Sequence, residues 1–163
     1  MREYYYIKIE FEGNRSYTLW YSDDEDGVLT EKSKITSFST LSELKEYTIV
    51  NKLYTPNDSV TEYDFDIINK WAEKPSELID SKMCIDYWNI FTDISKSIGI
   101  PFIGNFDTGI TIDIYNKLFY GSNVSAIRCD GEMYQPEWSE EELNQLAKIM
   151  KNGISLLSNS LKP

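Results

Sequence analysis

Hydrophobic and polar residues alternate one by one in two blocks near the start of the chain, residues 4–11 and residues 16–21. A period of two is typical of a half-buried β-strand, because successive side chains of a strand point to opposite faces. Gly13 and Asn14 lie between the blocks and are common turn residues. The pattern therefore predicts an antiparallel hairpin over residues 4–21.

Further along the chain, apolar residues recur at steps of three and four, which is the spacing of one face of an α-helix. Thr40 with Glu43, and Ser139 with Glu142, have the sequence of a capping box at the start of a helix. Gly99 follows the strongest helical period and is expected to end that helix in a left-handed conformation. Five helices are expected, at about residues 41–48, 67–73, 82–98, 110–120 and 139–160.

Weaker signals complete this outline. Asp66 stands where an N-cap is expected for the second helix, and Gly121 is expected to follow the end of the fourth. Ile35 and Phe38 lie among Ser and Thr residues and give a weak strand signal. This signal would extend the hairpin into a meander.

Strands come first along the chain and helices follow, which predicts one α+β domain over residues 1–163. We expect a small antiparallel sheet, made of the N-terminal hairpin and meander, with several helices packed on one face. Tyr4, Tyr6, Trp20 and Tyr63 would then lie opposite the core, where Tyr and Trp are suited to bind a protein partner. In the alternative, helices cover both faces of the sheet and these rings belong to the core.

The charge balance limits the classes of partner. The chain has 27 Asp and Glu against 16 Lys and Arg, a net charge of −11. This sign disfavours direct binding of nucleic acid and of anionic membranes. The first residues lack the basic and apolar regions of a signal peptide, and no apolar run reaches the length of a membrane span. We therefore expect a cytoplasmic protein.

Several kinds of chemistry are excluded because the sequence contains no histidine. Catalysis by Ser-His-Asp or Cys-His, and every metal site that needs His, cannot occur. Cys84 and Cys129 are too few for a Cys-ligated zinc site or a disulfide framework. We expect Cys84 to be a buried free thiol, and we expect no cofactor.

The acidic run Asp23–Asp26 before Gly27 invites comparison with a calcium-binding loop. If Gly27 stood at position six of an EF-hand loop, positions one and twelve would be Ser22 and Ser33. The first ligand and the bidentate Glu are thus both missing. No metal site is expected, and the run is interpreted as a solvated loop.

Three segments resemble a family of bacterial immunity proteins from contact-dependent growth inhibition and related polymorphic toxin systems. The segments are WNIFTDISKSIG at 88–99, IYNKLFYGSN at 114–123 and EWSEEELNQL at 137–146. The resemblance implies a cytoplasmic, non-catalytic protein that binds and neutralises the C-terminal toxin domain delivered by a neighbouring cell. Such a toxin is often a nuclease, whose basic cleft would suit an acidic partner.

The resemblance identifies no binding residue, so candidates come from acidic clusters beside aromatic rings. Charged residues around an aromatic anchor are typical of protein interfaces. One group of candidates is Trp20, Tyr21, Asp23, Asp24, Glu25 and Asp26, and the other is Glu62, Tyr63, Asp64 and Asp66.

Two other functions stay open. An adaptor protein with an unrelated protein partner would use the same kind of surface. A small hydrolase could use a pair of carboxylates as acid and base, although the sequence selects no pair. The candidates for that role are Glu62, Asp64, Asp66, Asp107 and Asp113.

Overall fold

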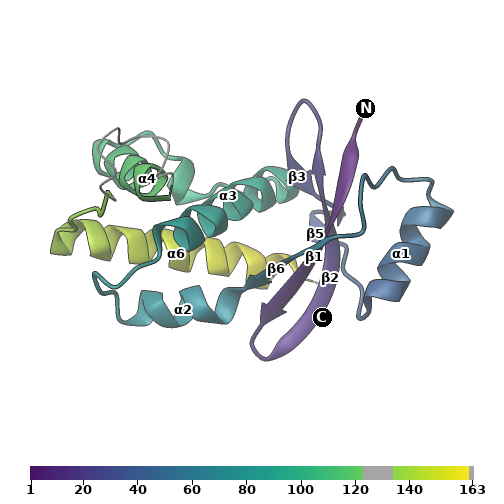
Figure 1. The fold of residues 1–163 in the computed structure, drawn as a ribbon, viewed down its shortest axis with the longest axis horizontal. Helices are drawn as coiled ribbons and strands as arrows, with labels where there is room; N and C mark the ends of the chain where they lie inside the picture. The colour runs from purple at the N-terminus through teal and green to yellow at the C-terminus, as the bar shows by residue number, and fades with distance from the viewer. Residues whose placement is uncertain (123–133, 162–163) are drawn as a thin grey trace.

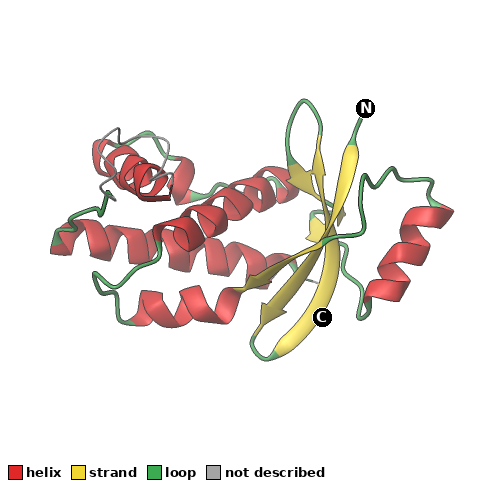
Figure 2. Ribbon diagram, in the orientation of Figure 1, coloured by secondary structure: helices red, strands yellow, loops and turns green. Residues whose placement is uncertain are grey.

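The computed structural model describes residues 1–122 and 134–161. Its main feature is a four-stranded sheet in the order β3-β2-β1-β6, drawn with the helices in Figure 1 and by element type in Figure 2. The strands are β1 (Glu3–Phe11), β2 (Asn14–Ser22), β3 (Gly27–Val28) and β6 (Val60–Asp64). The structure thus confirms an α+β fold with a small sheet.

The predicted hairpin is formed by β1 and β2, which pair antiparallel. Its turn consists of Glu12 and Gly13 rather than Gly13 and Asn14, because Asn14 already pairs with Phe11. Glu12 and Gly13 both have positive φ, 52° and 73°, as a two-residue turn between twisted strands requires. The carboxylate of Asp66 accepts both of their backbone N–H groups, at 2.8 and 3.3 Å.

The sheet is mixed, so the prediction of an entirely antiparallel sheet is wrong. Strand β6 pairs parallel with β1, with Ile9 opposite Tyr63. Between the hairpin and β6 the chain passes through helix α1 (Leu41–Val50). A long connection of this kind allows a strand to return in parallel, whereas a tight turn does not.

The weak strand signal around Ile35 corresponds to a two-stranded ribbon of β4 (Thr30–Glu31) and β5 (Lys34–Ile35). Phe38 forms an isolated antiparallel bridge with Tyr17 of β2. The region therefore continues the strand structure after the hairpin, as a separate small sheet.

The five expected helices are present, and both predicted capping boxes and the predicted end of α3 are confirmed. Thr40 with Glu43 and Ser139 with Glu142 form capping boxes, and Gly99 ends α3 with φ 72°. None of the described helices is long and apolar enough to cross a membrane. Besides α1, the helices are α2 (Phe65–Glu73), α3 (Ser81–Ile98), α4 (Gly109–Ser122) and α6 (Glu140–Ser160), with a 3-10 turn η1 (Ile103–Asn105).

Two predicted helix boundaries are wrong. Asp64, not Asp66, is the N-cap of α2, since its side chain accepts the Asp66 N–H at 3.0 Å. Gly121 lies inside α4 rather than after its end. Capping residues at neighbouring positions are chemically similar, so the sequence alone does not separate them.

Helices cover both faces of the sheet, which corrects the expectation that they occupy only one (Figure 1). On one face, β1 packs against α2, and its apolar residues share one core with the predicted apolar stripes of α3 and α6. On the other face, Leu44 of α1 covers Tyr6 and Leu19. Buried members of the larger core include Ile7, Ile9, Phe11, Trp88, Phe91, Ile94, Leu146, Met150 and Leu157.

The four aromatic rings expected opposite the core are divided between the two faces. Tyr6 is buried beneath α1, with Tyr4 partly buried beside it. Trp20 and Tyr63 lie on the α3 side, partly buried against the larger core. The alternative in which these rings contribute to packing is therefore confirmed.

Helices α3 and α6 approach closely where Gly153 meets the ring of Phe91. A Cβ atom at Gly153 would overlap that ring. Gly153 is buried, and no side chain separates the α6 backbone from Phe91 at this point. This contact allows both helices to pack against the same face of the sheet.

Candidate functional site

A hollow of about 360 Å³ lies between one face of the sheet and the polar side of α3. We call it the acidic hollow. Two aromatic rings and three carboxylates line it, together with other residues of α3. The lining residues are Trp20 (β2), Asp26 (the loop after β2), Tyr63 (β6), and Asp86, Asn89, Ile90, Thr92 and Asp93 (α3).

Trp20 is fixed in this hollow by a hydrogen bond and by a neighbouring ring. Its indole N–H donates to the carboxylate of Asp93 at 2.8 Å. Tyr5 lies opposite Trp20 on β1, and the two ring centroids are 5.4 Å apart. The indole therefore stays at the junction of sheet and helix, with part of its surface exposed.

Tyr63 forms a second aromatic wall. Its ring stacks on Phe65 at a centroid distance of 5.8 Å, which anchors it to the core. Burial, with the nearby negative charges of Asp86 and Asp93, raises the pKa of Tyr63 to about 12. Tyr63 thus remains neutral at physiological pH, with its ring beside negative charge.

Asp93 is the carboxylate with the most unusual environment in the hollow. Burial raises the pKa of Asp93 above its usual range, and the charge of Asp26 raises it further. The hydrogen bond from Trp20 and the charge of Lys96 act in the opposite direction. A carboxylate that is partly desolvated and close to a like charge is stabilised by any cation that enters.

The two other carboxylates are held by local partners. The hydroxyl of Ser22 donates to Asp26 at 2.9 Å. Lys82 pairs with Asp86 one helical turn away, at 2.6 Å, with both side chains well exposed. Among the described residues that line the hollow, none is Lys or Arg. The lining of the hollow is therefore negative, and Lys82, which pairs with Asp86, lies outside it.

A second, smaller hollow of about 210 Å³ adjoins the first on the same face of the sheet. Tyr5, Ile7 and Thr61 line it, and it shares Trp20 and Tyr63 with the acidic hollow. The two hollows meet at Trp20 and Tyr63 and form one continuous surface. A partner bound in the acidic hollow could also contact this less charged surface.

Only two residues of the first group of candidates lie in the acidic hollow. Trp20 and Asp26 line the acidic hollow. Tyr21 points to the other face, where Arg2 lies 4.1 Å above its ring and also pairs with Asp23 at 3.3 Å. The remaining members, Asp24 and Glu25, are exposed in the loop and do not line the hollow.

In the second group only Tyr63 lines the hollow. Asp64 caps α2 and Asp66 holds the hairpin turn, so both have structural roles. Glu62 pairs with Lys8 at 3.3 Å. None of the five carboxylates considered for hydrolysis lines the acidic hollow, because Asp107 and Asp113 also lie elsewhere and are exposed.

Sequence analysis missed the contribution of α3. Asp86, Asn89, Ile90 and Asp93 are spaced by three or four residues, so they share one face of the helix. The sequence shows this face, but it does not show that β2 and β6 lie against it. The long-range approach of Trp20 and Tyr63 creates the site.

Cys84 is fully buried in α3, as expected, and burial raises its thiol pKa to about 12. Cys129 lies outside the described residues. In the described part of the chain, no group of three or more His, Cys, Asp or Glu residues could hold a metal ion.

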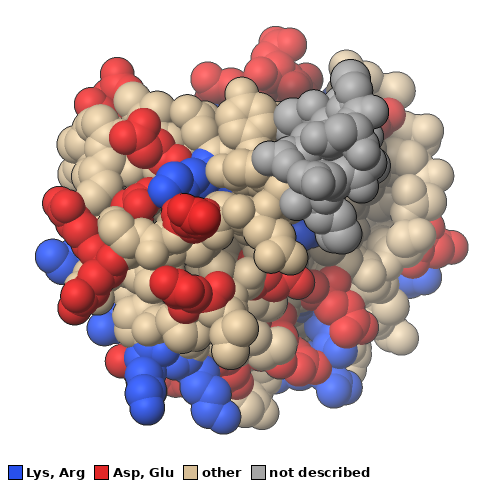
Figure 3. Space-filling view, turned by 60° about the vertical axis from the view of Figure 1, so that its left-hand side comes forward, with Lys and Arg blue, Asp and Glu red and all other residues tan. Residues whose placement is uncertain are grey.

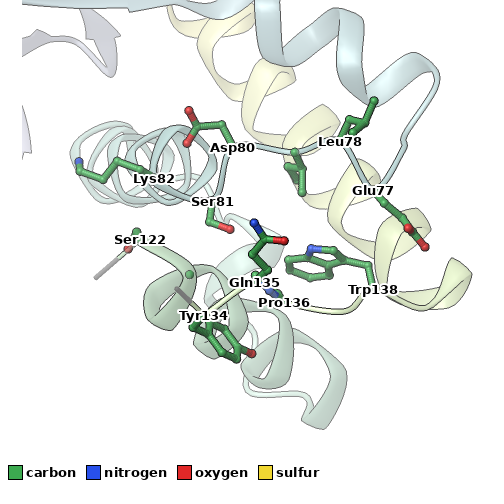
Figure 4. A pocket seen from close by; sticks show the side chains of 12 residues that line it. Glu77, Leu78, Asp80, Ser81, Lys82, Ser122, Tyr134, Gln135, Pro136 and Trp138 are labelled. Carbon is green, nitrogen blue, oxygen red and sulfur yellow. The ribbon is translucent and has the colours of Figure 1, made fainter. Parts of the chain in front are cut away.

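A larger hollow of about 720 Å³ lies where α3 begins, beside Trp138 and the end of α4 (Figure 4). Its lining combines Lys82 with Glu77 and Asp80, so it has no single charge sign. Acidic side chains are also spread over the face drawn in Figure 3, so negative charge is not confined to one place. The larger hollow also has aromatic walls, Tyr134 and Trp138, so the acidic hollow differs in having three carboxylates and no Lys or Arg among its described lining residues.

Comparisons with known proteins support the fold and not a family. No family model matches the chain, and no curated protein matches its sequence. Among solved structures, the chain is similar to the C-terminal domain of SatS, crystallised in complex with bromine. The TM-score is 0.56 at 13% sequence identity, over 98% of this chain and 92% of that domain. At this identity the likeness concerns the fold alone.

Proposed function

We propose that the protein binds a basic protein partner and neutralises it without turnover, as an immunity protein neutralises a cognate toxin domain. The partner would be the C-terminal domain of a toxin, and the binding would take place in the cytoplasm. One observation carries the proposal. The acidic hollow brings together Trp20, Asp26 and Tyr63, which come from both candidate groups, and adds Asp86 and Asp93.

The composition of this surface supports a protein partner rather than a small substrate. Partly exposed Trp and Tyr rings provide binding energy at interfaces, because they bury a large area with little loss of conformational freedom. The surrounding carboxylates add electrostatic complementarity to a basic surface. A nuclease toxin has such a surface because it must bind phosphates.

The net charge of −11 would act mainly on the rate of association. Long-range attraction between oppositely charged proteins raises association rates toward about 10⁸–10⁹ M⁻¹s⁻¹ at low salt. Rapid capture suits a protein that must inactivate a toxin before the toxin acts. In this proposal the negative charge of the whole surface speeds association, whereas the aromatic rings of the hollow provide binding energy once the partner has docked.

The proposal predicts that a toxin domain is encoded beside this gene, and co-expression of the two proteins tests it. Cells that produce both proteins should survive, whereas cells that produce the toxin alone should die. Death of the cells that produce both would overturn the immunity function. An adaptor with an unrelated partner would likewise fail to protect.

Charge reversal near the hollow tests the role of the surface. Asp24→Lys with Glu25→Lys changes two exposed positions in the loop that leads to Asp26. Association with the toxin domain should slow by about tenfold at low salt and become less dependent on salt. Asp107→Lys with Asp113→Lys makes the same change in charge near α4, and it should slow association less. Equal effects of both pairs would contradict binding at the hollow.

A carboxylate-dependent hydrolase is the second candidate because of one observation. Asp93, whose pKa is raised, shares the hollow with Asp26 and Asp86. A carboxylic acid with a raised pKa near a second carboxylate is the arrangement used by glycosidases. This function predicts that the purified protein hydrolyses aryl glycosides and that Asp93→Asn abolishes the activity. Absence of hydrolysis by the wild-type protein would exclude it.

A further inference from the structure

We propose that the acidic hollow binds the guanidinium group of an arginine side chain on the protein partner. The inference deepens the proposed function, since it names the group by which a basic partner would be held. It follows from four properties of the hollow: its aromatic walls, the separation of its carboxylates, the charge of its lining, and its size.

The aromatic walls suit a flat cation. Trp20 and Tyr63 both line the hollow, and both rings are held in place by a hydrogen bond or by stacking. Cations are attracted to the faces of aromatic rings, most strongly to Trp. A guanidinium group is planar and weakly hydrated, so it stacks on such rings more readily than an ammonium group does.

The carboxylates of the hollow come from separate places in the fold. Asp26 lies in the loop after β2, whereas Asp86 and Asp93 lie two helical turns apart on α3. Within the described residues no cluster of acidic side chains is close enough to hold a metal ion. Separated carboxylates fit a cation that carries several donors, and arginine offers five N–H groups in a fixed fork.

Charge complementarity favours the same occupant. The lining carries three carboxylates, and none of the described residues that line it is Lys or Arg. Lys82 pairs with Asp86 from outside the lining, where both side chains are exposed to solvent. Lys82 engages both carboxylate oxygens of Asp86 at 2.6 Å, so an arriving arginine would be held chiefly by Asp26 and Asp93.

The size of the hollow limits what can enter. Its volume of about 360 Å³ lies at the lower end of the range of small-molecule sites, about 300–1,000 Å³. One long side chain fits such a space, whereas a helix or a strand does not. The adjoining surface at Tyr5 and Thr61 remains available for the partner's neighbouring residues.

Three capped amino acids test the proposal without requiring a toxin. The probes are the N-acetyl amides of arginine, lysine and citrulline, followed by NMR at the indole N–H of Trp20. The Trp20→Phe variant identifies that signal. The arginine probe should shift it in a saturable manner, and the lysine probe should bind about threefold more weakly or worse. Citrulline has nearly the same shape without the charge and should not shift it.

A matched pair of variants locates the binding. Asp93→Asn removes a charge but keeps an oxygen that can accept the Trp20 hydrogen bond. It should weaken binding of the arginine probe by about threefold or more. Asp113→Asn makes the same charge change at an exposed position of α4 and should leave the affinity unchanged. The unchanged indole signals of Trp71, Trp88 and Trp138 would show that each variant is folded.

The outcomes separate this inference from the proposed function. Lack of a shift with arginine, or equal shifts with all three probes, would overturn the arginine site even if the protein protects cells from the toxin. Equal affinity for lysine and arginine would overturn the preference for guanidinium. Specific binding of the arginine probe together with failure of the survival assay would retain the site and reject the immunity function.

Discussion

The indole N–H of Trp20 donates a hydrogen bond to the carboxylate of Asp93, and this bond joins β2 to α3. The two residues are 73 positions apart in the sequence. The bond holds one wall of the acidic hollow and keeps a carboxylate beside it. The stability of the fold and the properties of the site therefore depend on the same pair.

The raised pKa of Asp93 predicts a stability difference that depends on pH. Its folded-state pKa lies above the unfolded value, so the folded protein binds this proton more tightly. The contribution of Asp93 to stability is thus fully present below the unfolded pKa and is lost as pH rises through the folded pKa. Asp93→Asn, which stays neutral, should gain stability relative to wild type as pH increases across that window.

Urea denaturation of both proteins between pH 3 and pH 7 measures this difference. Asp113→Asn serves as the control, because Asp113 is exposed on α4. A difference between wild type and Asp93→Asn that stays constant with pH, or moves in the opposite direction, would contradict the raised pKa.

Substitution at Gly153 tests the close approach of α3 and α6. Gly153→Ala places a methyl group where it overlaps the Phe91 ring, and it should destabilise the protein by about 1–3 kcal/mol. Alanine is otherwise favoured over glycine inside a helix by about 1 kcal/mol, so a loss of stability identifies the overlap. Thermal and chemical denaturation provide the measurement.

A second substitution distinguishes overlap from a general effect on α6. In the Phe91→Ala background Cγ and the ring are both absent, so Gly153→Ala should destabilise much less than in wild type. Equal losses in the two backgrounds would show that Phe91 is not the cause.

The thiol of Cys84 should be unreactive in the folded protein. Burial raises its pKa to about 12, so almost none of it is thiolate at neutral pH. With Cys129→Ser in place, a thiol reagent at pH 7.5 should modify Cys84 only as fast as the protein unfolds. The rate should therefore rise with urea in step with unfolding, and rapid reaction without urea would contradict the burial.

The features that sequence analysis predicted well are those determined by neighbouring residues. The capping boxes at Thr40 and Ser139, the left-handed end at Gly99 and the β1–β2 hairpin all depend on a few consecutive positions. Hydrogen bonding and backbone preferences of consecutive residues determine such features, so they can be predicted without knowledge of tertiary contacts.

The features that it missed depend on contacts between distant segments. No local pattern shows that β6 pairs parallel with β1, or that α1 covers the face containing Tyr6. The same limit applies to the candidate site. Asp64 and Asp66 are acidic residues close to an aromatic ring, which is typical of a binding site, yet both side chains accept hydrogen bonds from backbone N–H groups. Asp86 and Asp93 belong to the site only because the fold brings α3 against Trp20.

The position of α1 has a consequence for motions of the native protein. This helix stands apart from the others across the sheet, and the cluster beneath it has three buried residues, Tyr6, Leu19 and Leu44, with partly buried ones around them. The cluster is much smaller than the larger core, so detachment of α1 would expose less apolar area than global unfolding and would leave the larger core intact. Amide hydrogens of α1 should exchange with solvent through this partial opening, whereas those of α3 should exchange only when the whole molecule unfolds. The protein would then contain two cooperative units of unequal stability on opposite faces of the sheet, the α1 cluster and the larger core.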